Sequence, residues 1–288
     1  MTYGKLAGCV IIGTSLHNPT ELSMPGLRLF PVLLIAALTA ACATSPTGQS
    51  QLLLFPDSEM ARMGAVAFEE TKKRTPPSKD PRLISYVQCV ASALTRQAPG
   101  GVQWEVQVFE SPDINAFALP GGKIGIYTGI LKVASNQHQL AAIIGHEIEH
   151  VLANHGNARV SAAYAAQGAL TLTQALAGAP SPMKDQMFGL LGVGAQYGIL
   201  MPYGRGQETE ADVLGLDLMA RAGFDPREAV QLWRNMSQAA GGRSPPAFLS
   251  THPANEARIR VLNQRMPQAL SLYEAARNSG RRPDCRQP

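Results

Sequence analysis

Residues 146–150 read His-Glu-Ile-Glu-His, an H-E-x-x-H pattern. On a helix, positions four apart lie on one face, so the imidazoles of His146 and His150 can reach one metal ion. Glu147 is rotated by about 100° from that face and can address a water molecule beside the metal. The neighbouring residues are apolar, which predicts the dry surround that an activating zinc site needs. We therefore expect a zinc site that activates water, with Glu147 as the general base.

Two histidines leave a tetrahedral zinc ion in need of a third protein ligand. The metzincin pattern would need glycine at position 153 and histidine at position 156, and the chain has Ala153 and Gly156, so that class is excluded. His155 would lie about 140° around the helix from His150. We expect His155 to mark a helix end rather than to bind the metal.

The remaining ligand candidates are two carboxylates near position 210. Glu208 and Asp212 are four residues apart and share a helix face, so one can bind zinc while the other accepts the second ring N–H of a liganding histidine. The alternative is a solvated helix start whose acidic residues complement the helix dipole. Glu210 points about 160° away from Glu208, so we expect a surface or packing residue.

The hydrophobic pattern predicts an α+β domain in which helices predominate. Expected helices cover about 57–73, 82–97, 136–154, 158–176, 187–200, 208–222, 226–236, 254–266 and 269–277. Expected strands cover about 102–110 and 124–128, where apolar and polar residues alternate or follow a Gly-Gly turn. The glycine-rich segment 187–205 has a second interpretation as a lid or a membrane-facing flap.

The amino-terminal segment has the features of a secretory signal. Arg28 precedes an apolar run of about ten residues, which is too short to span a membrane as a helix. The following L-T-A-A-C resembles a lipobox, so Cys42 is expected to be lipidated, although an ordinary cleaved signal is the alternative. We expect a signal peptide at 1–41, with Met24 as a possible true start, and a flexible lipidated tether at 42–56. The protein would then lie in the periplasm, anchored to the outer membrane.

Charge and cysteine content narrow the possible partners. The net charge is only +4 and no basic run occurs, so nucleic acid is not an expected partner.

The four cysteines have no C-x-x-C spacing, which excludes a thiolate zinc ribbon. In an oxidising compartment Cys89 and Cys285 remain as a pair, and we predict a disulfide that ties the tail at 278–288 to an early helix. A buried Cys89 with a mobile Cys285 is the alternative.

Four elements resemble, in order, those of the M48 zinc metallopeptidases, which are the Ste24, HtpX and Oma1-like gluzincins. They are N-A-F-A-L-P-G-G at 115–122, H-E-I-E-H at 146–150, R-G-Q-E-T-E-A-D at 205–212 and T-H-P through R-I at 251–259. The resemblance covers about residues 58–266 and implies a zincin (gluzincin) domain at 57–277, with a small β-sheet beside the H-E-x-x-H helix. The periplasmic lipoprotein branch of LoiP and BepA type is the closer likeness, in the shorter LoiP-like form without helical repeats.

This resemblance implies one Zn²⁺ per chain, held by His146, His150 and Glu208. It also implies that Glu147 is the general base and acid and that Asp212 supports a liganding histidine. The implied activity is a metalloendopeptidase that cleaves misfolded or misassembled envelope proteins. A chaperone or assembly factor for outer-membrane proteins on the same fold is the alternative, and outer-membrane assembly machinery is a possible partner.

The substrate side of the site is less specified. The resemblance implies that Asn115, Ala116 and Phe117 line the cleft, and the strand after Gly122 is expected to receive an extended peptide by strand addition. Candidate donors to the developing oxyanion are His252, Tyr203, Asn115 and Arg205, with His252 first because the T-H-P element recurs in the family. Alternatively, His252 caps a helix, or fills the open zinc position and holds the enzyme inactive.

Overall fold

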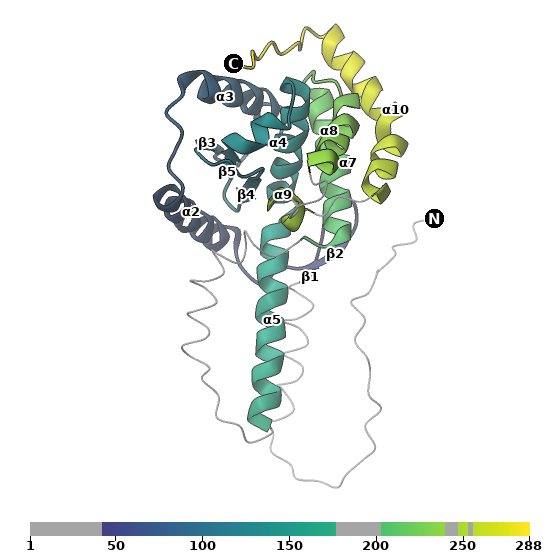
Figure 1. Cartoon of the computed structure of the whole chain (residues 1–288). Coiled ribbons are helices and arrows are strands. Elements are labelled where there is room, and N and C mark those ends of the chain that lie inside the picture. The colour runs from purple at the N-terminus through teal and green to yellow at the C-terminus, as the bar shows by residue number, and fades with distance from the viewer. Residues whose placement is uncertain (1–41, 177–202, 240–246, 253–255) are drawn as a thin grey trace, which may run out of the picture.

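The computed structural model describes residues 42–176, 203–239, 247–252 and 256–288. Within these ranges the protein is a mostly helical α+β domain with a small sheet, as predicted (Figure 1). The expected signal peptide at 1–41 and the expected helix at 187–200 lie outside the described residues. No helix within the described ranges is both long enough and apolar enough to cross a membrane.

The sheet that lies beside the central helix has three strands in the order β3-β5-β4. β3 (Glu105–Phe109) is parallel to β5 (Lys123–Tyr127), and β4 (Ala116–Leu119) is antiparallel to β5. β3 and β5 confirm the two predicted strands. β4 was not predicted because all four of its side chains are buried, so its sequence shows no alternation. β5 is paired on both sides, which corrects the expectation that it receives a substrate strand.

The central helix is α4 (Gln137–Leu152), which carries the H-E-x-x-H residues. It begins where the Asn136 side chain accepts hydrogen bonds from the backbone N–H groups of His138 and Gln139. The residues from Gln139 to His150 are buried with one exception, because the sheet, α3 (Pro81–Thr95) and α8 (Arg227–Ala239) pack around this helix. The metal-binding pattern therefore lies in the core of the domain.

α4 crosses α7 (Arg205–Arg221) at two glycines, Gly145 and Gly215. A Cβ atom added to Gly215 would lie 2.9 Å from the backbone nitrogen of His146, so the two helices touch backbone to backbone. α10 (Glu256–Asn278) packs along the other side of α7. The close crossing holds the carboxylates of α7 beside the histidines of α4.

The carboxy-terminal region differs from the prediction of two helices. α10 is one helix that continues through Pro267, whose missing N–H removes only one helical hydrogen bond. The tail after α10 returns to α3, where a disulfide joins Cys285 to Cys89. The backbone N–H of Cys285 also donates to the Gln137 side chain, so the start of α4 is tied to the tail.

In the described part of the chain, α2, α5 and α9 complete the set of α-helices. α2 (Asp57–Arg74) covers the sheet, where Phe68 packs with Phe109, Phe117 and Leu119. α5 (His155–Leu176) follows α4 and extends away from the rest of the domain (Figure 1). α9 (Ala247–Thr251) is a single short turn that places His252 next to α4.

The expected flexible tether is wrong for residues 42–52. β1 (Cys42–Thr44) and β2 (Ser50–Leu52) pair as an antiparallel hairpin, with Cys42 exposed at its start. Side chains of this hairpin reach α7 and the end of α4: Gln49 donates to the carbonyl of Gly206, and Gln51 donates to the carbonyl of Ala153. These contacts with the domain order a segment whose Thr, Ser, Pro and Gly composition suggested a linker.

Candidate metal centre

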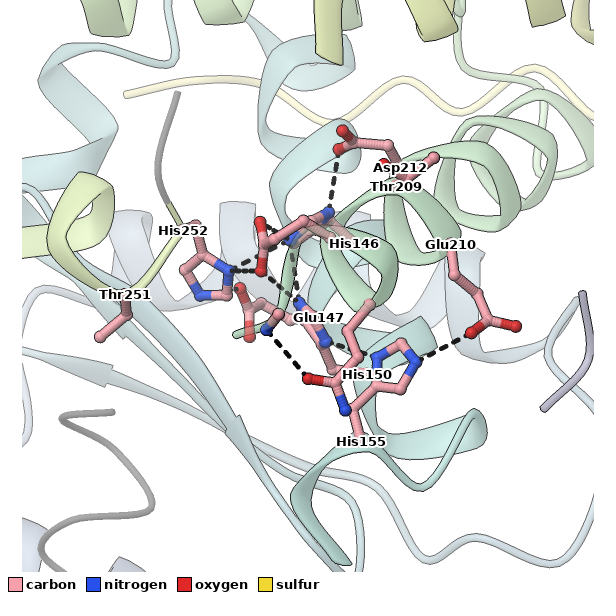
Figure 2. Close-up of polar contacts among 12 residues, drawn as sticks. His146, Glu147, His150, His155, Thr209, Glu210, Asp212, Thr251 and His252 are labelled. Carbon is pink, nitrogen blue, oxygen red and sulfur yellow. Dashed lines mark hydrogen bonds and ion pairs between the residues drawn. The ribbon is translucent and has the colours of Figure 1, made fainter. Parts of the chain in front are cut away.

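Four buried side chains from three parts of the chain converge on one point (Figure 2). His146 and His150 come from one face of α4, Glu208 comes from the first turn of α7, and His252 follows α9. One nitrogen or oxygen atom of each lies within 4.8 Å of those of the other three. The expected ligands His146, His150 and Glu208 are therefore together, and His252 joins them.

The separations between these atoms are close to those of a tetrahedral metal site. Nε2 of His146 lies 3.0 Å from Nε2 of His150, 3.6 Å from Oε2 of Glu208 and 3.2 Å from Nδ1 of His252. Oε1 of Glu208 lies 3.4 Å from Nε2 of His150 and 3.0 Å from Nδ1 of His252. A tetrahedral zinc with bonds of about 2.0–2.2 Å separates its ligand atoms by about 3.3–3.6 Å. The residues present therefore fit a zinc ion.

Asp212 supports His146 from the side opposite the cluster. Its Oδ1 lies 3.1 Å from Nδ1 of His146, as expected for a carboxylate that accepts the second ring N–H. Burial lowers the pKa of His146, but the hydrogen bonds to Asp212 and Glu208 outweigh it and raise this pKa to about 9. A metal ion that binds Nε2 must therefore displace a proton from this histidine.

Arg258 is a site residue to which sequence reasoning assigned no role. Its guanidinium donates to both oxygens of Asp212, at 2.6 and 2.7 Å, and lies 2.6 Å from Oε2 of Glu208. Burial raises the pKa of Asp212, but the ion pair with Arg258 outweighs it and holds this pKa below its ordinary value. Arg258 also lies over the Trp233 ring. Its only signal in the sequence was its place in the R-I element.

His150 is supported differently, through a second histidine. Its Nδ1 lies 2.8 Å from Nδ1 of His155, whose Nε2 lies 3.1 Å from Oε2 of Glu210 (Figure 2). His155 begins α5, in agreement with its prediction as a helix-end residue, and it is not in the metal cluster. Glu210 was expected to be a surface or packing residue, and its 2% exposure shows that the packing alternative holds. The hairpin at 42–52 covers the face of α7 that carries Glu210. The position of Glu210 relative to Glu208 on the helix could therefore not show that Glu210 is buried and contacts His155.

Glu147 lies beside the cluster with no exposed surface. Among the described residues, neither of its carboxylate oxygens has a hydrogen-bond partner, and Oε1 lies 3.3 Å from Nε2 of His252. Buried carboxylate oxygens are normally hydrogen-bonded, so this arrangement fits a group that is kept available for a reacting proton.

A cavity of about 430 Å³ opens beside the metal cluster. His150 and Tyr203 form one side, and Met60 of α2, Ala118 of β4 and the turn after Pro120 form the others. The lining is mainly apolar, which suits a peptide side chain.

Among the expected substrate residues, one lines this cavity and the others do not. Tyr203 lines it and stacks on His150, with ring centroids 3.7 Å apart. Phe117 instead packs with Phe68 and Phe109, and Ala116 is buried in the main core, which corrects their expected place in the cleft. The carbonyl of Asn115 accepts a hydrogen bond from Tyr127, and Arg205 is exposed at the start of α7.

Comparisons with known proteins agree with this geometry. The sequence model of Peptidase family M48 matches residues 77–266. The chain is 34% identical over 220 residues to "Mitochondrial metalloendopeptidase OMA1" of Schizosaccharomyces pombe, covering 75% of this chain and 63% of that protein. Against "Metalloendopeptidase OMA1, mitochondrial" of Homo sapiens, identity is 31% over 275 residues, or 86% and 50% of the two chains. Against "Beta-barrel assembly-enhancing protease" of Escherichia coli, it is 28% over 215 residues, or 72% and 44%. The chain thus spans between 44% and 63% of the lengths of these relatives.

Proposed function

The chain belongs to peptidase family M48, and from this premise we propose that it is a zinc-dependent metalloendopeptidase. The observation that carries the proposal is the buried cluster of His146, His150 and Glu208, with the carboxylate of Glu147 beside it and without a hydrogen bond to any described residue. Zinc is the cofactor of M48 metallopeptidases, and the tetrahedral spacing of the ligand atoms supports one zinc ion per chain.

In the mechanism we infer, zinc supplies a Lewis acid that lowers the pKa of water and polarises a peptide carbonyl. Glu147 accepts a proton from the attacking water and returns it to the leaving amine. Asp212 holds His146 in the orientation that presents Nε2, and Arg258 holds both Asp212 and Glu208 in place. The dry core around α4 strengthens each of these charge interactions.

We propose that His252 inhibits the enzyme in the position that it occupies in this structure. Its Nδ1 lies 3.0 Å from Glu208 and 3.2 Å from Nε2 of His146, where water or a substrate carbonyl would have to bind. Nε2 of His252 lies 3.3 Å from Oε1 of Glu147, so an oxyanion formed beside Glu147 would be within reach of this imidazole, as the sequence suggested. His252→Ala tests the two roles: inhibition predicts higher basal activity, whereas an oxyanion donor predicts lower activity.

An extended substrate would lie along β4. Within the described residues β4 has a strand neighbour on one side only, so its other edge has no strand partner and is the edge at which we propose strand addition. The cavity lined by Ala118 and His150 would then receive one side chain. Recognition through backbone hydrogen bonds predicts broad specificity.

We propose misfolded or misassembled envelope proteins as substrates and the periplasm as the location, with a lipid on Cys42. The signal-like segment at 1–41 and the likeness to a protein named "Beta-barrel assembly-enhancing protease" support this. Cys42 begins the hairpin and is exposed, which is compatible with an anchor at this point. A chaperone or assembly role on the same fold is the second candidate, supported by the same relative.

Glu147→Gln separates these candidates. The amide cannot accept the proton, so peptide hydrolysis should fall by about 100-fold or more, while zinc stays bound at one ion per chain. Glu149→Gln, the same change two positions along α4, is the matched control and should keep activity. Envelope proteins trapped by Glu147→Gln would identify substrates. Full hydrolysis by Glu147→Gln would refute the mechanism, and full assembly activity without hydrolysis would favour the chaperone.

A further inference from the structure

We propose that His155 and Glu210 form a relay that holds His150 in its metal-binding orientation, and that the hairpin at 42–52 completes the relay. This inference rests on the proposed metal site. It assigns a positioning role to two residues outside the cluster and links the amino-terminal hairpin to metal binding.

The Glu210 carboxylate at the end of the relay determines which atom donates in each hydrogen bond. An ionised Glu210 carboxylate can only accept, so Nε2 of His155, 3.1 Å away, must carry the proton of that contact. A neutral imidazole has one donor and one acceptor, so Nδ1 of His155 accepts from Nδ1 of His150 at 2.8 Å. Nε2 of His150 is then left with its lone pair directed into the cluster. This is the tautomer that a metal requires.

The hairpin fixes the far end of the relay. The backbone N–H and the hydroxyl of Thr47 donate to Oε1 of Glu210 at 2.7 and 2.8 Å, and the Gln49 side chain lies 3.3 Å from Oε2. These donors come from a chain segment 161 to 163 residues away from Glu210. Glu210 therefore cannot rotate towards water without losing all of them.

The two histidines that α4 contributes to the cluster are thus supported through different parts of the fold. His146 depends on Asp212 and Arg258, which belong to α7 and α10. His150 depends on a chain that leads to the hairpin next to Cys42. Residues that support a metal ligand in this way typically change metal affinity by about 10- to 100-fold. Loss of the relay should therefore weaken metal binding measurably even while the support of His146 is intact.

The test compares two substitutions of His155 in the full chain. The side-chain amide of His155→Gln can both accept from His150 and donate to Glu210, whereas His155→Phe keeps a ring of similar size and does neither. The zinc dissociation constant is measured by chelator competition, and the cobalt-substituted form gives a visible spectrum that reports ligand geometry. We expect about 10- to 100-fold weaker zinc binding and an altered cobalt spectrum for His155→Phe, and binding within about threefold of wild type for His155→Gln.

A second arm tests the hairpin and does not depend on the folding of His155→Phe. Thr47→Val combined with Gln49→Ala removes two side-chain donors to Glu210 and should weaken zinc binding severalfold. Gln51→Ala removes a hairpin contact outside the relay and should bind zinc as wild type does. Equal zinc affinities of the double variant and wild type, or equal losses in His155→Phe and His155→Gln, would overturn the relay. Failure of the wild-type chain to bind zinc would instead overturn the proposed metal site.

Discussion

The substitution Gly215→Ala tests whether the contact between α4 and α7 sets the geometry of the metal site. The added methyl group would lie 2.9 Å from the nitrogen of His146, 3.0 Å from the carbonyl carbon of Gly145 and 3.1 Å from the Cα atom of His146. All three neighbours are backbone atoms, so no side-chain rotation can relieve the overlap. The helices must move apart instead.

The size of the effect follows from these distances. Ordinary contacts begin near 3.4 Å, so the helices must separate by about 0.5 Å at this point. Overpacking of this kind destabilises a protein by about 1–3 kcal/mol, which lowers the melting temperature of a chain this long by about 2–12 °C. A metal site tolerates shifts of only about 0.2 Å in its bond lengths. Glu208 and His146 lie on opposite sides of the contact, so we expect zinc affinity to fall about tenfold or more.

Thermal unfolding and chelator competition on the same preparations provide the assay. Gly168→Ala is the control, because this glycine is also helical and, apart from the backbone of its own helix, no atom of the described residues lies within 4 Å of its added methyl group. We expect Gly168→Ala to keep zinc affinity and to gain about 0.5–1 kcal/mol of stability from lower backbone freedom. If Gly215→Ala kept both the melting temperature and the zinc affinity of wild type, the close crossing would not control the site.

Three further predictions concern stability. Replacing Cys89 and Cys285 together by serine should lower the free energy of unfolding by about 2–5 kcal/mol, and a reductant should then affect wild type but not the variant in denaturant titrations. Burial is the main cause that raises the pKa of Glu149 to about 7. Its contribution to stability is complete below its unfolded value of 4.5 and is lost as the pH rises through 7, so Glu149→Gln should raise the melting temperature more at pH 8 than at pH 5. Arg258→Ala leaves Asp212 buried without its cation and should destabilise the protein by about 3–5 kcal/mol; losses that simply add in the double alanine variant would argue against this ion pair.

The parts of the site that could be predicted are those set by helix geometry. Four-residue spacing is enough to place His146 and His150 on one face, and the same rule brings Glu208 and Asp212 together on α7. The disulfide was predictable from the expected oxidising compartment and the number of cysteines that remained. These inferences need only local periodicity or counting.

The parts that could not be predicted depend on contacts between distant segments. Arg258 reaches Asp212 only because α10 packs against α7, and 46 residues separate the two. Glu210 is buried because the hairpin at 42–52 covers α7, although its own sequence has the composition of a linker. β4 is buried on both faces, so no alternation indicated that it is a strand. In each case a tertiary contact outweighs the local pattern.

The disulfide has a consequence for the survival of a chain that is proposed to hydrolyse peptide bonds. Cys89 and Cys285 are 196 positions apart, and every ligand of the metal cluster lies inside the covalent ring that they close. One accidental cut within this ring, by a neighbouring molecule of the same kind, leaves the two pieces joined. The nicked molecule keeps both halves of its metal site at high local concentration and can reassemble. Its mass on a non-reducing gel would stay that of the whole chain, and only reduction would separate the fragments.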